Sequence, residues 1–216
     1  NMPHNAEFAI LEMGMSSPGE IHNLSIIVKP DIAIITNVEV AHLQYFENME
    51  TIAAAKAEIF DGMQAGSTAI INFDNHYRYI LQEAAVAKGL KVLGFGQAND
   101  ANAQLTEYSQ SDTIAQIKFS LEGHVYFEEL GILGEHQAKN TIAVFLAAYA
   151  LTGRIPHNVL KEFQAQDGRG KVIEKNGITI IDDAYNASPA SVKAALTVFK
   201  NRTAKRKIAV LGDMRE

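Results

Sequence analysis

Short apolar runs alternate with longer stretches of helical periodicity through the first half of the chain. These runs are too short to be buried helices and are typical of buried parallel strands: residues 8–11, 32–35, 69–71 and 92–93. Between them, residues 51–63 and 77–87 carry apolar side chains at spacings of three and four, as amphipathic helices do. The alternation predicts an α/β fold, with a mostly parallel sheet and helices on both of its faces.

The pattern changes beyond residue 113. Apolar positions alternate in two segments between residues 113 and 130, separated by Gly123, which predicts a small antiparallel excursion at the rim of the sheet. Gly134 then precedes a long predicted helix over residues 136–151, and Gly153 ends it. The apolar stripe of this helix contains Ile142, Phe145, Leu146 and Tyr149.

The last quarter of the chain has the pattern of a second folding unit. A short helix is predicted over residues 156–164, and the turn-rich Asp167-Gly168-Arg169-Gly170 that follows indicates a hinge. One βαβ unit is predicted next, with a strand at 178–181, a helix at 190–200 and a strand at 208–211. Because a single βαβ unit cannot bury both faces of its strands, we expect two units, residues 1–168 and a truncated 169–216.

Composition narrows the classes of protein to which the chain can belong. Of its 216 residues, 47% are hydrophobic and 20% charged, which suits a globular core. The formal net charge of −6 gives no basic excess, so nucleic acid is not an expected partner. The absence of Cys excludes disulfides and thiolate metal sites, and no apolar run approaches the roughly 18 residues of a membrane helix. Without the pattern of a signal peptide at residues 1–5, the cytoplasm is the default location.

Polar residues that follow the predicted strands are the first candidates for chemistry. In an open α/β sheet, ligands bind at the carboxyl ends of the strands, where this chain places Glu12, Asn37, Asp74 and Asp183. A carboxylate there suits Mg²⁺ beside phosphate groups. A helix cap or a solvated loop group is the alternative for Glu12, and the favoured interpretation for Asp74.

Lys56 is the most informative single residue. At about 100° per residue it lies about 40° from Ile52 and between Ile52 and Phe60, inside the apolar stripe of its helix. Its stem could be buried with the ammonium in water. Alternatively, a partly desolvated amine with a lowered pKa would be nucleophilic or open to modification.

Three further residues have a functional and a structural interpretation. His42 follows the 32–35 strand and could ligate a metal, although lone histidines are more often structural. Asn140, in the first turns of the long helix, could contact a planar base with its amide or simply face solvent. Arg169, between two glycines, could reach an anion or be an ordinary surface arginine.

Two common nucleotide motifs are missing. The stretch Gly168-Arg169-Gly170-Lys171 lacks the upstream Gly and the Ser or Thr of a P-loop, and Gly94-Phe95-Gly96 lacks the third Gly of the dinucleotide fingerprint. The residues alone therefore indicate an α/β protein that handles phosphate or metal.

A set of motifs in fixed order resembles the Mur ligase family, the ATP-dependent amide-forming enzymes of peptidoglycan synthesis. The matching stretches are Leu11-Glu12-Met13-Gly14 with Gly19-Glu20-Ile21, Thr36-Asn37-Val38 with Ala41-His42-Leu43, Ala55-Lys56-Ala57-Glu58-Ile59-Phe60, Gly134-x-His136-x-x-x-Asn140, Gly168-Arg169, Asp182-Asp183-Ala184-Tyr185-Asn186-Ala187 and Leu211-Gly212-Asp213-Met214. They are most similar to the branch that joins D-alanyl-D-alanine to UDP-N-acetylmuramoyl-tripeptide through an acyl phosphate.

The resemblance implies ATP, two Mg²⁺ ions and a role for each matching residue. Glu12 would ligate the Mg²⁺ between the ATP β- and γ-phosphates, and His42 with Lys56, the latter as a carbamate, would hold the second. His136 and Asn140 would contact adenine, Asp183 the ribose and Arg169 the γ-phosphate, with Asn37 also in the nucleotide site. His42, Lys56 and Arg169 would serve catalysis.

The resemblance also implies a three-domain enzyme of which this chain is the middle: a central ATP-binding domain without its P-loop and the first part of a Rossmann-like C-terminal domain. Such a fragment is expected to be inactive alone and, with a sheet edge uncovered, to self-associate. Three alternatives remain open: a ligase of the folylpolyglutamate synthase type, a non-catalytic nucleotide- or partner-binding module, and a carbamate-lysine hydrolase, for which only His42 is well placed.

Overall fold

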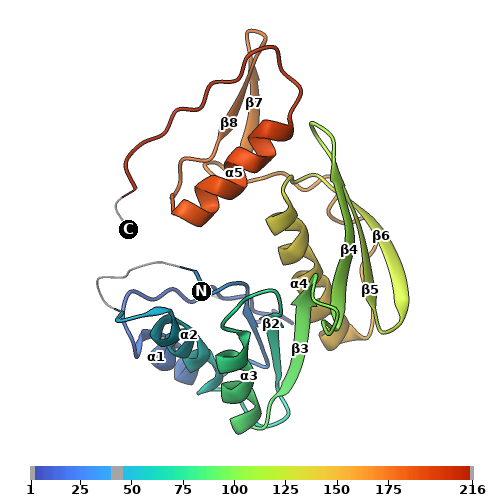
Figure 1. Cartoon of the computed structure of the whole chain (residues 1–216). Helices are drawn as coiled ribbons and strands as arrows, with labels where there is room; N and C mark the ends of the chain where they lie inside the picture. The colour runs from blue at the N-terminus through green and yellow to red at the C-terminus, as the bar shows by residue number, and fades with distance from the viewer. Residues whose placement is uncertain (1–2, 40–45, 215–216) are drawn as a thin grey trace.

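A six-stranded sheet forms the centre of the molecule in the computed structural model, which describes residues 3–39 and 46–214 (Figure 1). Its strands follow the chain in the order β1 (Ile32–Ile35), β2 (Thr68–Asn72), β3 (Lys91–Gly96), β4 (Ala103–Gln110), β5 (Ala115–Leu121) and β6 (His124–Leu130). β1 to β4 pair in parallel, and β4 to β6 are antiparallel. The predicted α/β fold with a mostly parallel sheet is confirmed.

Helices cover both faces of this sheet, as predicted. They are α1 (Glu20–Val28), α2 (Met49–Ala57), the short 3-10 helix η2 (Glu58–Phe60), α3 (Arg78–Ala87) and α4 (Glu135–Thr152). The alternation of strand side chains separates two cores. Ala69 and Ile71 of β2 pack with residues of α2 and α3, whereas Ile70 packs with residues of α4.

The antiparallel excursion is confirmed, and it continues the main sheet. β4 joins β3 through the pairs Phe95↔Ala103 and Gly96↔Gln104. The sequence did not predict β4, because a shift of register between Leu105 and Glu107 breaks the alternation that identifies a half-buried strand. Burial alternates cleanly along β5, whose inward side chains pack against α4.

The long helix is present as α4, with Gly153 at its C-cap in the left-handed conformation (φ 69°). The shorter helix predicted at 156–164 is wrong, because the backbone of Asn158 has φ 57°, which no α-helix accommodates. The segment is instead bound to β6. His157 Nδ1 lies 2.8 Å from Glu128 Oε1, and the Asn158 N–H donates to Glu128 Oε2 at 2.8 Å.

Two of the predicted strands are wrong. Residues 8–11 and 208–211 form no strand, and their apolar side chains are exposed, to 98% at Ile10 and 92% at Val210. An apolar run becomes a strand only when a neighbour satisfies its backbone groups. Neither segment pairs with another strand within the described residues.

The C-terminal segment forms a hairpin and a helix instead of a βαβ unit. β7 (Lys171–Lys175), which the sequence did not predict, pairs antiparallel with β8 (Ile178–Asp182), and α5 (Pro189–Asn201) follows. The turn residues Asn176 and Gly177 both have positive φ, as type I′ hairpin turns require. In Figure 1 this second, two-stranded sheet lies apart from the first, with α5 beside it.

None of the helices within 3–39 and 46–214 combines the length and the apolar character that crossing a bilayer requires.

Candidate functional site

The loops after β1 and β2 are joined by asparagine side chains. Asn72 Nδ2 donates to the Thr36 carbonyl at 2.9 Å, and Asn75 Nδ2 donates to Asn37 Oδ1 at 2.5 Å and to the Val38 carbonyl at 2.9 Å. Asn37 Nδ2 in turn donates to Glu39 Oε1 at 2.9 Å. The amide of Asn37 is thus engaged on both its oxygen and its nitrogen, and it fixes the edge of the sheet where ligands are expected to bind.

Lys56 lies in the last turn of α2 between buried residues of that helix. Ile52, Ala55 and Ala57 are all buried, and Lys56 itself is half-buried. Burial lowers the pKa of its amine below the ordinary lysine value. Among the described residues the amine has no hydrogen-bond or ion-pair partner. A desolvated, unpartnered amine is what the second interpretation of Lys56 requires.

Glu58, two residues beyond Lys56, caps another helix. Its carboxylate accepts the Gly19 N–H at 2.8 and 3.0 Å and the His22 N–H at 3.1 Å, so it satisfies the N-terminus of α1. Gly19, the N-cap residue, has φ 89° and offers no side chain for this purpose. Sequence reasoning missed Glu58. The sequence did contain a sign of this role: Gly precedes the helix where Ser, Thr, Asp or Asn usually stands, so the cap has to come from elsewhere in the chain.

Further contacts hold α1 against η2 and the residues after it. Ser25 Oγ donates to the Ile59 carbonyl at 2.5 Å and accepts the Gly62 N–H at 2.9 Å. Asp61 Oδ2 lies 2.7 Å from His22 Nδ1, and Asp61 Oδ1 lies 2.8 Å from Lys88 Nζ. Burial acts to raise the pKa of Asp61, but the hydrogen bonds and charges of Lys88 and His22 outweigh it and lower the pKa. The segment that begins at Glu12 therefore leads into a helix firmly attached beside Lys56.

Of the predicted metal ligands, Glu12 and Lys56 lie within the described part of the chain. Glu12 is exposed and has no partner among the described residues, and His42 lies outside them. Within 3–39 and 46–214, no cluster of three or more His, Cys, Asp or Glu could hold a metal ion. The donor chemistry nevertheless suits a hard cation, because Glu12 offers an uncommitted carboxylate and Lys56 an amine able to become a carbamate.

The N-terminus of α4 carries His136 and Asn140. Tyr108 Oη accepts the N–H of the N-cap residue Gly134 at 2.8 Å, and the His136 ring packs so closely that a Cβ added at Gly134 would lie 2.5 Å from Cε1. Burial lowers the pKa of His136, while the charges of Asp183 and Glu135 act to raise it. His136 and Asp183 are therefore near enough to interact electrostatically, and Asn140 is half-buried one turn further along.

The predicted hinge at residues 167–170 is a turn bound to the end of β8. The N–H of Gly168 donates to Asp182 Oδ2 at 3.1 Å, and its carbonyl accepts the Tyr185 N–H at 3.1 Å. A Cβ at Gly168 would lie 2.9 Å from that of Tyr185. The Arg169 guanidinium is exposed and lies over the Tyr185 ring, 4.0 Å from its centroid. Sequence reasoning did not identify Tyr185 as the support of Arg169.

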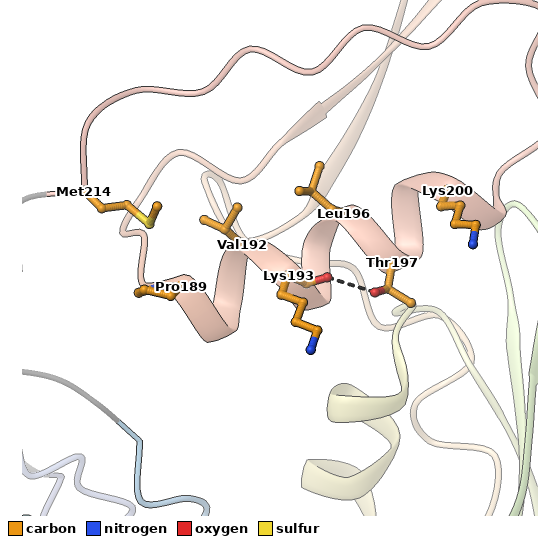
Figure 2. Close-up of a pocket in the computed structure, with 7 residues that line it drawn as sticks. All are labelled: Pro189, Val192, Lys193, Leu196, Thr197, Lys200 and Met214. Atoms are coloured by element: carbon orange, nitrogen blue, oxygen red, sulfur yellow. Dashed lines mark hydrogen bonds between the residues drawn. The ribbon is translucent and has the colours of Figure 1, made fainter. Parts of the chain in front are cut away.

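An apolar groove of about 450 Å³ lies on α5, and none of the predicted site residues is among those that line it (Figure 2). It is lined by Pro189, Val192, Lys193, Leu196, Thr197, Lys200 and Met214. The only polar contact drawn among these side chains is the bond from Thr197 Oγ1 to the Lys193 carbonyl, at 2.8 Å. The polar residues of the groove are two lysines and a threonine, with no carboxylate or imidazole among the residues that line it.

Comparison with known families and proteins gives a consistent result. Residues 1–148 match the model of the Mur ligase middle domain, and residues 168–216 match that of the Mur ligase glutamate ligase domain. The chain is 38% identical, over 220 residues, to the UDP-N-acetylmuramoyl-tripeptide--D-alanyl-D-alanine ligase of Bacillus subtilis, covering 100% of this chain and 46% of that protein. It is 34% identical, over 219 residues, to the ligase of the same name from Rickettsia prowazekii. That alignment covers 100% of this chain and 49% of the Rickettsia protein.

Solved structures agree with the sequence relatives. MurF from Acinetobacter baumannii superimposes with a TM-score of 0.83 at 27% identity, covering 94% of this chain and 44% of that one. A MurF ligase from Thermotoga maritima, in complex with ADP, superimposes with a TM-score of 0.77 at 27% identity. The superposition covers 87% of this chain and 43% of that one. A point mutant of L. casei FPGS, at 16% identity and a TM-score of 0.70, shares the fold, with 88% and 46% covered. The chain spans about half the length of the curated relatives it matches.

Proposed function

Because this chain belongs to the Mur ligase family, we propose that it is the central part of an ATP-dependent ligase that joins D-alanyl-D-alanine to UDP-N-acetylmuramoyl-tripeptide. The observation that carries the proposal is the alignment of the whole chain with ligases of that name. The fold supports it through the shared arrangement of sheet and helices. Two units are proposed, an ATP-binding unit at residues 1–168 and the start of a Rossmann-like unit at 169–216.

The nucleotide is assigned to the space between the N-terminus of α4 and the end of β8. His136 and Asn140 would contact the adenine, Asp183 the ribose and Arg169 the γ-phosphate, and Asn37, after the end of β1, would also belong to the nucleotide site. The electrostatic coupling of His136 with Asp183 supports this, because residues from the two proposed units then face one ligand. The exposed guanidinium of Arg169, supported by Tyr185, is available to an anion.

Two Mg²⁺ ions are proposed beside the phosphates. Glu12 would hold one, and His42 with the carbamate of Lys56 would hold the other. Bound there, such ions would neutralise charge on the transferring phosphoryl group. The lowered pKa of Lys56 supports the carbamate, since only a neutral amine adds to CO₂.

The proposed reaction has two steps. The substrate carboxylate attacks the γ-phosphorus of ATP, the bond to ADP breaks, and an acyl phosphate forms. The amine of D-alanyl-D-alanine then attacks the acyl carbon, inorganic phosphate leaves with the bonding electron pair, and the amine proton is lost. Arg169 would stabilise the charge of the phosphoryl group in the first step. Both substrates are small soluble molecules, and we place the reaction in the cytoplasm.

The test is ADP release by the complete ligase that contains this sequence. Release should require both the tripeptide nucleotide and D-alanyl-D-alanine. Release that depends on a folate and glutamate instead would favour a folylpolyglutamate synthase, and ATP binding without release would favour a non-catalytic module. Lys56→Ala should depress turnover and be partly rescued by short carboxylates. Full activity of that variant would remove the carbamate from the mechanism.

A further inference from the structure

The carboxylate of Asp74, at the carboxyl end of β2, is bonded to two other parts of the fold. Its Oδ1 accepts the backbone N–H groups of Gln97 at 2.7 Å and Ala98 at 2.9 Å, just beyond the end of β3. Its Oδ2 lies 2.9 Å from Nζ of Lys139 on α4. The carboxylate is therefore occupied by protein groups, which agrees with the structural interpretation that the sequence favoured.

The fold is shaped to receive this carboxylate. Gly96 has φ 138°, which side chains rarely adopt, and a Cβ there would lie 2.6 Å from Asp74 Oδ1, so any side chain at this position would displace the carboxylate. The side chains of Asp74 and Lys139 are 21% and 20% exposed. At this depth an ion pair is screened less than one at the surface and holds a more definite geometry.

Lys139 connects this carboxylate to the part of α4 that faces the proposed nucleotide. It directly precedes Asn140 and lies one turn beyond His136. Lys139 Nζ is also 3.4 Å from Glu135 Oε1, so the pair reaches the first residue of the helix. The bond from the Gly134 N–H to Tyr108 Oη is a further attachment at this helix end.

We propose that Asp74 and Lys139 are positioning residues, which set the first turns of α4 against the ends of β2 and β3 so that Asn140 and His136 meet the adenine of ATP. The inference rests on the proposed function and adds to it a specific source of base recognition. Neither residue touches the nucleotide. The pair acts through the placement of α4, whose displacement by a fraction of an ångström would loosen hydrogen bonds to a planar base.

The experiment measures steady-state kinetics of the complete ligase with ATP and with GTP, together with ADP affinity by calorimetry. Asp74→Asn retains an oxygen that can accept the Gln97 and Ala98 N–H groups, and Lys139→Met retains the helical side-chain stem, so each removes chiefly the ion pair. Each should raise KM for ATP about tenfold and weaken ADP binding about equally, with KM for GTP and for D-alanyl-D-alanine unchanged. The double variant should be no worse than either single one.

The matched control is Asp100→Asn. Asp100, in the loop between β3 and β4, forms a two-point ion pair at 2.9 and 3.0 Å with Arg78, the first residue of α3, and so joins elements other than α4. The Asp100→Asn variant should leave KM for ATP, for GTP and for D-alanyl-D-alanine unchanged. Lys139→Arg should restore the preference for ATP over GTP.

Loss of stability without loss of the ATP preference would overturn the inference, as would equal increases in KM for ATP and GTP. Should Asp74→Asn fail to fold, Lys139→Met alone decides, because it leaves the backbone bonds of Asp74 in place. Measurements on the wild-type ligase distinguish failure of the proposed function from failure of the positioning role. If it binds no ADP and uses no ATP, the proposed function fails; if it does both and the variants behave like it, only the positioning role fails.

Discussion

The guanidinium of Arg169 lies 4.0 Å from the centroid of the Tyr185 ring. The two residues come from different segments, the turn before β7 and the loop after β8, and the backbone hydrogen bond from the Tyr185 N–H to the Gly168 carbonyl joins those segments. A cation above an aromatic face is attracted to it and loses rotational freedom. The contact therefore favours one orientation of the Arg169 side chain over the others.

Tyr185→Ala should therefore lower kcat of the complete ligase about two- to fivefold, corresponding to the roughly 0.5–1 kcal/mol of an exposed cation–π contact. Tyr185→Phe preserves the aromatic face and should retain wild-type kcat. Steady-state assays at saturating substrates check both. Equal loss in the two variants would assign the effect to the hydroxyl group and not to the ring.

Glu58 is expected to stabilise the α1 end of the molecule. Glu58→Ala removes an acceptor shared by the Gly19 and His22 N–H groups and should lower the free energy of unfolding by about 1–2 kcal/mol, as loss of a helix cap does. Urea unfolding measures the change, and amide hydrogen exchange at residues 19–22 should accelerate. Glu83→Ala, an exposed glutamate on α3, is the control and should have little effect.

Lys56 should make the stability of the chain depend on pH. Its pKa is lower in the folded state than the ordinary 10.5, so the unfolded state binds more protons between the two values. Stability should therefore rise as pH increases through that window, up to about 10.5. Lys56→Met removes the buried charge and should be more stable than wild type below the window, with a flatter pH profile. A wild-type profile that falls over this range would contradict the assignment.

The sequence correctly predicted strands in which an apolar run also pairs with a neighbouring strand of the sheet. β1, β2 and β3 combine a buried apolar run with neighbours on the sheet, and Lys56 is half-buried as its place in the apolar stripe indicated. Residues 8–11 are as apolar as β1 but pair with nothing in the described part of the chain.

Long-range contacts account for most of what the sequence could not predict. The bonds of Glu58 to Gly19, of Asp74 to Lys139 and of Arg169 to Tyr185 join residues distant along the chain, and no periodicity records them. The short helix expected at 156–164 failed for the same reason, since Glu128 on β6 fixes the backbone at Asn158.

The chain expressed by itself should self-associate. β1 is an edge strand of the six-stranded sheet, and the segment before α1 exposes Phe8, Ile10 and Leu11; an open sheet edge and exposed apolar side chains both favour association. Light scattering should show a mass that grows with concentration. Ile10→Lys should reduce the association by adding charge to the exposed run. A strictly monomeric species at high concentration would contradict the prediction.

The stability of the fold should depend on the absence of a side chain at Gly62. A Cβ there would lie 2.0 Å from the Ser25 carbonyl oxygen and 2.8 Å from Ser25 Oγ, so Gly62→Ala must push α1 away from the end of η2. The backbone bond from Gly62 to Ser25 Oγ would be lost with it, and we expect a destabilisation of about 2–4 kcal/mol. Gly212→Ala is the matched control, because a Cβ at Gly212 meets nothing within 4 Å. Urea unfolding of the two variants should differ accordingly, and equal stability would show that α1 does not approach Gly62 this closely.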